Sequence, residues 1–226
     1  MIKEIASIFN RNITLIVMLS FSLVLPLSMF LFIAVIYIYG YAEINLKNIY
    51  ALCLSILNFT LVFPPFFLLV KKDMTGEEVR FRELIKYFFD KFGFVLLTTV
   101  FLYVIALAGF FLLFIPTIIS IFMLLLFPLY LEQERFGLVF KNTWKLIKQE
   151  HLFLIVDLLL IVSLYLLLWS GAFYLMSSFD NNSFVYMILR AIMNALAFPL
   201  MYFYLICKYR KDFSYNEQQL KWERGF

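Results

Sequence analysis

An uncharged stretch of forty residues constrains the fold of this chain more than any other feature. From Phe92 to Leu131 there is no Asp, Glu, Lys, Arg or His. As a helix rising about 1.5 Å per residue, this stretch would reach roughly 60 Å, which is twice the hydrocarbon thickness of a bilayer. We therefore predict two membrane crossings joined by a turn near Pro116, or nearer Gly109 if the second crossing is longer.

The rest of the sequence has the composition of an integral membrane protein. Hydrophobic residues make up 64% of the 226 positions, which excludes the water-facing surface of an ordinary soluble domain. The apolar runs predict an all-α, polytopic fold with six transmembrane helices in one membrane domain, residues 1–226. The predicted spans are residues 13–39, 49–70, 92–114, 117–131, 152–176 and 184–207, followed by a polar tail at 208–226.

The basic residues predict how the chain is oriented. Seventeen of the 19 Lys and Arg residues flank the spans on one side, while Lys47 alone lies on the other and Arg190 falls inside the last span. Because basic flanks are retained on the cytoplasmic side, we expect a multi-pass protein of the bacterial inner membrane with both termini cytoplasmic. The outer connections, residues 40–48, the Pro116 turn and residues 177–183, are short. The first apolar run is too long for a signal-peptide core and predicts a retained anchor.

Amphipathic helices are predicted in the inner segments, where apolar residues recur at helical spacing opposite charged ones. The first inner segment has Phe81, Leu84, Ile85 and Phe88 on one face. The second has Phe136, Phe140 and Trp144, and a weaker version occupies residues 2–9. Thr75 with Glu78 three residues later predicts a capping box that starts the first of these helices near Gly76.

Each amphipathic segment leads into a pair of spans, which predicts a threefold repeat of an elbow helix and a transmembrane hairpin. Two interpretations of the elbows remain open. They can lie at the cytoplasmic interface with their basic side chains near anionic headgroups. Alternatively, the apolar faces named above can dock a cytoplasmic partner, as coupling helices do in transport complexes.

Four polar residues at membrane depth are candidates for function: Asp157, Arg190, Asn58 and Asn194. A carboxylate at depth costs a few kcal/mol unless it is paired, hydrated or protonated. We expect either a pathway role for Asp157 or a structural one, in which Lys208, Tyr202 or Tyr204 satisfies it. Arg190 is expected to snorkel toward the outer interface without pairing directly with Asp157, and the two asparagines to bond across helices.

The sequence contains no catalytic or metal-binding pattern. His151 is the only histidine, which excludes multi-histidine metal sites and HExxH proteolysis. The nucleophile elbow, the P-loop and the GxGxxG fingerprint do not occur. Cys53 and Cys207 both fall in apolar runs, so neither a disulfide framework nor a CxxC site is expected. We predict a chain that is not an enzyme, needs no cofactor and binds no nucleic acid.

Two segments resemble the inner loops of the YesL-like family of bacterial membrane proteins. They are Val70-Lys71-Lys72-Asp73-Met74-Thr75-Gly76-Glu77-Glu78, followed by residues 81–92, and Phe127-Pro128-Leu129-Tyr130, leading to Phe140-Lys141-Asn142. The resemblance implies an accessory role in sugar import. The second half is also similar to the YciC-type and glycerophosphodiesterase membrane-domain families, which share the elbow-plus-hairpin pattern, and neither resemblance supplies catalytic residues.

These observations favour a non-enzymatic accessory or scaffold protein in the bilayer, associated with subunits of a carbohydrate transport system. The alternative is a small-molecule transporter or substrate-binding membrane subunit with Asp157 in its pathway. That alternative depends on helices kinked by prolines, namely Pro26, Pro64, Pro65, Pro128 and Pro199. A polar cavity that reaches Asp157 would favour transport, whereas tight apolar packing would favour the scaffold.

Overall fold

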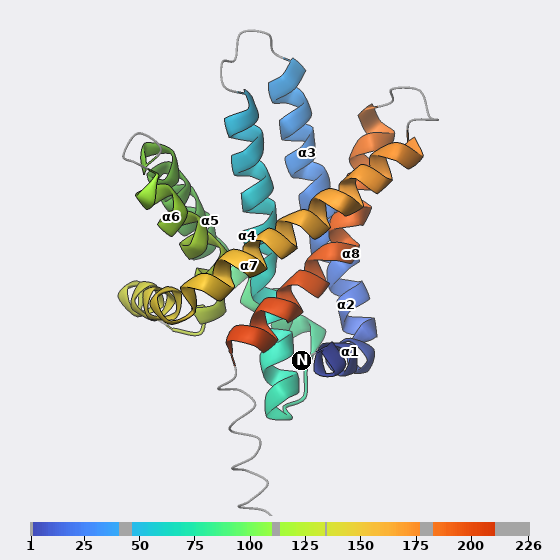
Figure 1. Cartoon of the computed structure of the whole chain (residues 1–226). Helices are drawn as coiled ribbons and strands as arrows, with labels where there is room; N and C mark the ends of the chain where they lie inside the picture. Colours follow the sequence, from blue (N-terminus) through green and yellow to red (C-terminus); the bar gives the residue numbers. More distant parts are fainter. Residues whose placement is uncertain (1, 41–46, 110–113, 134, 177–182, 211–226) are drawn as a thin grey trace, which may run out of the picture.

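The computed structural model describes residues 2–40, 47–109, 114–133, 135–176 and 183–210, and every regular element among them is helical (Figure 1). The outer connections predicted at 40–48 and 177–183 and the polar tail fall largely outside these residues. The elements are α1 (Ile2–Arg11), α2 (Ile13–Leu19), the π-helical η1 (Ser20–Val24), α3 (Leu25–Gly40), α4 (Lys47–Thr75), α5 (Phe81–Gly109), α6 (Ile115–Leu126), the 3₁₀-helical η2 (Phe127–Tyr130), α7 (Phe136–Met176) and α8 (Ser183–Tyr209).

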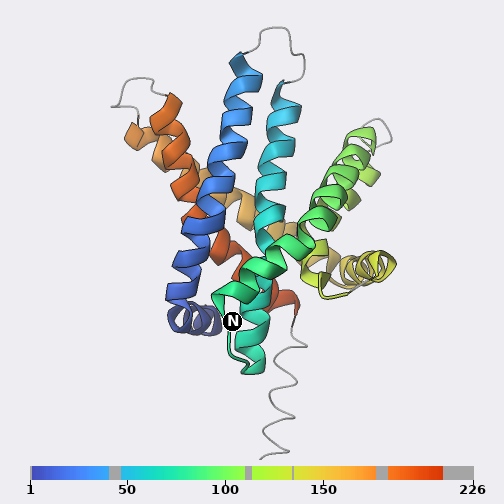
Figure 2. The same ribbon diagram turned by 180° about the vertical axis from the view of Figure 1, so that it is seen from behind.

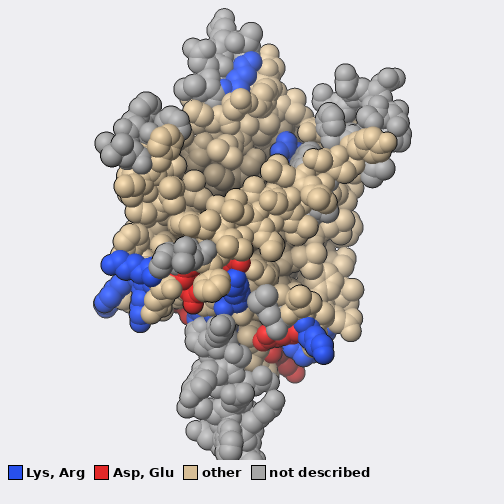
Figure 3. All heavy atoms as spheres, in the orientation of Figure 1, with Lys and Arg blue, Asp and Glu red and all other residues tan. Residues whose placement is uncertain are grey.

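The long helices run between two ends of the molecule, and the two views agree on this arrangement (Figures 1 and 2). The N-terminus and the end of α8 lie at the same, lower end. Most of the Lys, Arg, Asp and Glu atoms on the face shown in Figure 3 gather there, and the region above is almost entirely formed by other residues. We call this lower end the basic end.

Four helices are long and apolar enough to cross a membrane: Ile13–Gly40, Lys47–Thr75, Phe81–Gly109 and Phe184–Tyr209. A fifth crossing is present if the bent pair Phe136–Glu150 and Phe153–Leu167 counts as one span. The remaining predicted span, residues 117–131, corresponds to Ile115–Tyr130, which is shorter than a crossing helix needs to be. The protein therefore has four to five apolar helices of membrane-spanning length among its described residues.

The turn in the long uncharged stretch lies before Pro116, and the helix predicted over 92–114 ends at Gly109. Helix α5 ends at Gly109, and α6 begins at Ile115 with Pro116 in its first turn. A Cβ added to Gly109 would lie 2.6 Å from the backbone nitrogen of Thr117, so only glycine permits this close approach of the two helices. The Thr117 hydroxyl donates a hydrogen bond of 2.7 Å to the Ala106 carbonyl across the same contact.

The predicted capping box at Thr75 is wrong, because Thr75 ends a helix. It is the last residue of α4, and Gly76 follows with a φ of +71°. The Glu77 amide bonds to the Lys72 carbonyl at 2.9 Å and the Gly76 amide to the Asp73 carbonyl at 3.3 Å, which is the Schellman pattern of a helix C-terminus. The amphipathic helix begins at Phe81 instead and continues without a break into the span.

In two of the predicted elbows, a single non-helical residue separates the elbow from its span. The backbone angles of these two residues are similar. Asn12 lies between α1 and α2 at φ −111° and ψ 16°, and Glu150 interrupts α7 at φ −116° and ψ 18°. At Glu150 the chain bends by 97° between Phe136–Glu150 and Phe153–Leu167. We call Phe136–Glu150 the α7 elbow. Because the Phe81 segment is continuous with its span, the threefold repeat stays a prediction.

Prolines act differently from one helix to the next. The π-helical turn η1 immediately precedes Leu25 and Pro26, and Pro128 lies in η2, where α6 changes to 3₁₀ geometry. Both are adjustments expected where proline removes a backbone donor. In contrast, Pro64, Pro65 and Pro199 lie inside the uninterrupted helices α4 and α8.

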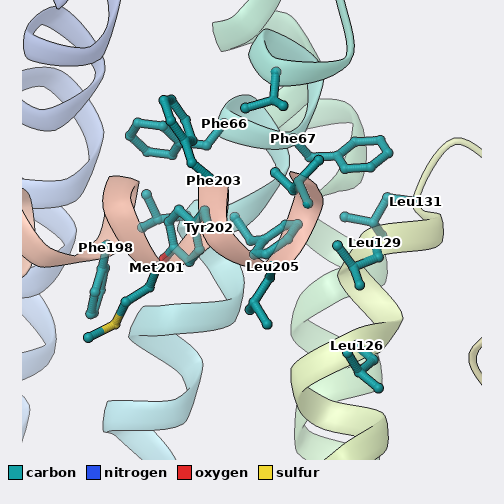
Figure 4. Packing of buried hydrophobic residues seen from close by; sticks show 14 of the residues in the cluster. Phe66, Phe67, Leu126, Leu129, Leu131, Phe198, Met201, Tyr202, Phe203 and Leu205 are labelled. Atoms are coloured by element: carbon teal, nitrogen blue, oxygen red, sulfur yellow. The ribbon is translucent and has the colours of Figure 1, made fainter. Parts of the chain in front are cut away.

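The core lies toward the basic end, where α4, α8 and the α6–η2 segment converge (Figure 4). Tyr202 is fully buried, with its ring centroid 4.8 Å from that of Phe63 and 5.4 Å from that of Phe66. The Tyr202 hydroxyl donates a hydrogen bond of 2.6 Å to the Phe59 carbonyl. Large rings fill this region closely, so the helices are fixed by packing as well as by the apolar length of the spans.

Candidate functional site

The carboxylate of Asp157 is buried between α7 and α8. Asp157 is 3% exposed, and its Oδ1 accepts hydrogen bonds from Tyr204 at 2.7 Å and from the Lys208 ammonium at 2.6 Å. Its Oδ2 accepts a hydrogen bond from the Tyr209 hydroxyl. One positive charge and two phenols therefore compensate the carboxylate, as a charge removed from water requires.

Helical spacing explains why two of the three partners meet at one carboxylate. Tyr204 and Lys208 are four residues apart on α8 and so share a face, and Tyr209 follows at the last turn of the helix. The sequence correctly indicated Lys208 and Tyr204 as partners. Tyr202 is not one, since its hydroxyl bonds to Phe59, and Tyr209 was missed because a residue five positions after Tyr204 does not share its face of the helix.

A small pocket adjoins Asp157 but has an apolar wall. It lies between α6, α7 and α8, and its volume of about 10 Å³ has room for about one water molecule. Apart from Asp157, the lining residues are all apolar: Phe122, Leu125, Leu126, Leu154, Leu158, Ile161 and Leu205. The pocket therefore reaches the carboxylate without the additional polar groups that would bind or relay a polar solute.

The arrangement around Asp157 can join helices but lacks the parts of a reaction centre. A carboxylate bonded to a lysine and two phenols offers no activated nucleophile with a base in reach. Among the residues that the structure describes, no group of three or more His, Cys, Asp or Glu side chains could hold a metal ion. The side chain of His151 lies outside the described residues.

Asn58 and Asn194 meet at a single serine between four helices. The Asn58 amide donates a hydrogen bond of 2.9 Å to the Ser28 hydroxyl, and the Asn194 amide donates one of 3.3 Å to the same oxygen. The Tyr165 hydroxyl donates a hydrogen bond of 2.8 Å to Oδ1 of Asn194. Both asparagines thus bond across helices as expected, and they join α3, α4, α7 and α8.

Arg190 contacts an aromatic ring of a neighbouring helix. Its guanidinium carbon lies 4.4 Å from the centroid of Phe32, which places α8 against α3. A cation over an aromatic face is favourable, and more so where water is sparse. This stacking differs from the simple snorkelling expected from the sequence.

Much of the proposed partner face on the amphipathic segments is already covered by the chain itself. Leu84 and Phe88 are 0% and 6% exposed, so these two residues belong to the core and not to a partner surface. Four others are partly buried and pack against the core: Phe81, Ile85, Phe140 and Trp144. Phe136 is the most accessible of the set, at 48% exposed, and its ring contacts Phe94 and Phe140.

Two ionic clusters at the basic end were not predicted. Arg210 is 3% exposed, and its guanidinium bonds to Glu132 at 2.5 Å and to the Leu129 carbonyl, while Lys71 bonds to the other Glu132 oxygen at 2.6 Å. In the second cluster, Arg11 and Asn12 both bond to Asp73. The partners are separated by about sixty to eighty residues, so no local pattern could have paired them.

Comparison with protein-family models, with curated proteins and with solved structures finds no match to this chain. The resemblance to the YesL-like family stays a prediction from the sequence.

Proposed function

We propose that this chain is a non-enzymatic accessory or scaffold protein of the cell membrane that binds subunits of a transport system. The supporting observation is that the four intramembrane polar residues all contact neighbouring helices: Asp157 binds α8, Asn58 and Asn194 bind Ser28 of α3, and Arg190 stacks on Phe32. These residues hold the helices together and do not line a polar passage. Carbohydrate import is the process that the family resemblance implies.

We further propose six crossings with both termini in the cytoplasm, so that the basic end faces inward. Labelling of single cysteines in a Cys53→Ala, Cys207→Ala background tests this topology. A membrane-impermeant thiol reagent should label Asn48→Cys in intact cells and Glu78→Cys only after permeabilisation, because both positions are exposed and lie at the start of α4 and beyond its end. Labelling of Glu78→Cys in intact cells would contradict the proposal.

A mild-detergent pull-down of the tagged protein tests the accessory function. We expect a permease or a transport ATPase to co-purify reproducibly. The Asp157→Asn variant should recover the same subunits at unchanged abundance, because Lys208 is 24% exposed and can be solvated without its partner. Isolation of the chain alone, in repeated preparations at endogenous levels, would contradict the accessory function.

The pocket beside Asp157 is the observation that favours the alternative, a small-molecule transporter. In that case Asp157→Asn should abolish a transport phenotype while abundance and thermal stability stay unchanged. Leu158→Ala serves as the matched control, since Leu158 lines the same pocket and carries no charge. Loss of transport in Asp157→Asn but not in Leu158→Ala would support the transporter over the scaffold.

A further inference from the structure

The α7 elbow presents one uniformly basic face. Val139, Thr143, Leu146 and Ile147 are buried, whereas Lys141, Lys145 and Lys148 are exposed. The three lysines are spaced by four and three residues, so they form a stripe about 10 Å long on one side of the helix. The space-filling view shows a group of basic atoms at the corner of the basic end where the elbow lies (Figures 1 and 3).

Several other basic residues at the same end have acidic partners. Arg11, Lys72 and Lys208 form ion pairs with Asp73, Glu83 and Asp157 respectively. Within the described part of the chain, no salt bridge is found for Lys141 or Lys145. Between residues 135 and 149 the sequence contains no Asp or Glu, and the one acidic residue of the elbow is Glu150 at its end.

The remaining side chains of the elbow suit a membrane interface. The Lys148 ammonium lies 5.4 Å from the centroid of the Trp144 ring, and tryptophan and lysine stems are typical of the headgroup region. Leu138, three residues before Lys141, is 40% exposed and offers apolar contact beside the lysines. The 97° bend at the end of the elbow turns it away from the span direction, as an interfacial helix requires.

We propose that Lys141, Lys145 and Lys148 bind the phosphate groups of anionic phospholipids in the cytoplasmic leaflet. The stripe is positive, exposed and beside apolar anchors, which is the combination that an anionic bilayer surface complements. The inference rests on the proposed topology but not on the transport partner. Binding would orient the elbow and, through Glu150, the span that follows it.

Quenching of Trp144 fluorescence by brominated lipid tests this directly. The full chain, carrying Trp169→Phe and Trp222→Phe, is placed in vesicles of phosphatidylcholine and phosphatidylglycerol with bromine on one lipid or the other. We expect stronger quenching by the brominated phosphatidylglycerol, and a loss of that preference of roughly fivefold for each lysine changed to glutamine. Raising the salt concentration should weaken the preference as well.

Matched substitutions on the other amphipathic segment provide the control. Arg82→Gln, Lys86→Gln and Lys91→Gln remove the same charge from a segment that also carries Glu83 and Asp90, and they should leave the preference at Trp144 unchanged. An unchanged preference in the α7 elbow variant would overturn the proposal. A co-purifying acidic protein lost from that variant, with lipid preference intact, would also overturn it by identifying a protein as the occupant.

Failure of the accessory function would leave the quenching result unaffected, because that measurement uses the purified chain alone. Equal thermal stability of the elbow variant and the parent chain is expected, since all three lysines are exposed. A preference lost from a variant of equal stability therefore reports the lipid contact.

Discussion

Replacing Glu132 by alanine is expected to lower the free energy of unfolding by about 3–5 kcal/mol, because it removes a carboxylate that is bonded to the buried Arg210 guanidinium. Glu132 joins Arg210, at the end of α8, to Lys71 of α4. Arg210 is 3% exposed, and without Glu132 its charge stays buried beside the Leu129 carbonyl and the rings of Phe67 and Tyr130. Denaturation of the purified protein in mixed micelles measures the loss.

Two further variants separate this effect from a general response to losing a carboxylate. Glu78→Ala removes an acidic side chain that is 90% exposed and lies 3.8 Å from Arg80, so its cost should stay below about 1 kcal/mol. Adding Arg210→Met to Glu132→Ala removes the buried guanidinium charge as well, and should restore part of the stability. Equal losses for Glu132→Ala and Glu78→Ala would show that the cluster does not hold the basic end together.

Replacing Tyr202 by alanine is expected to cost a similar amount, about 3–5 kcal/mol, through the loss of packing in the aromatic core. Tyr202 is fully buried, and its ring centroid lies 4.9 Å from that of Phe59 and 4.8 Å from that of Phe63. In a bilayer, lipid is as apolar as the core, so burying the ring gains little by removing it from water. The loss of stability therefore comes mainly from the missing packing contacts. The same micelle denaturation measures this change.

The Tyr202→Phe variant keeps the ring and removes only the hydroxyl. Loss of its hydrogen bond to the Phe59 carbonyl should cost about 1 kcal/mol, because that carbonyl can still accept within α4. Leu97→Ala, at a side chain 71% exposed, is the control for truncation and should cost far less. If Tyr202→Phe were as destabilising as Tyr202→Ala, the hydrogen bond and not the ring would be the main contribution.

The features predicted well from sequence are those that depend on local periodicity and apolar length. The run from residue 13, the run around Asn58 and the run around Asn194 all form helices of membrane-spanning length. The α7 elbow also appears where its spacing indicated, and Asp157 is bonded by Lys208 and Tyr204 because i, i+4 residues share a helix face. The helices and the elbow follow from residues within a few helical turns, whereas the contacts of Asp157 join two different helices and were expected only from the face that Tyr204 and Lys208 share.

The errors arose where two local patterns competed or where the answer depended on a distant segment. Thr75 and Glu78 matched a capping box, but Gly76 permitted a left-handed residue and ended α4 instead. In the uncharged stretch, the close approach at Gly109 ends α5 before Pro116, at the alternative position for the turn, and the second leg is still shorter than a crossing helix. In both cases glycine geometry decided the boundary.

Apolar length and charge placement were enough to establish that this is a helical membrane protein and to locate most of its helices, because burying backbone polar groups in lipid leaves few alternatives to a helix. Only the packed structure decided which distant charges meet: Glu132 with Arg210 and Lys71, Asp73 with Arg11, and Tyr209 with Asp157. Such pairings depend on the rotation and depth of each helix against its neighbours, and a one-dimensional pattern does not contain those quantities.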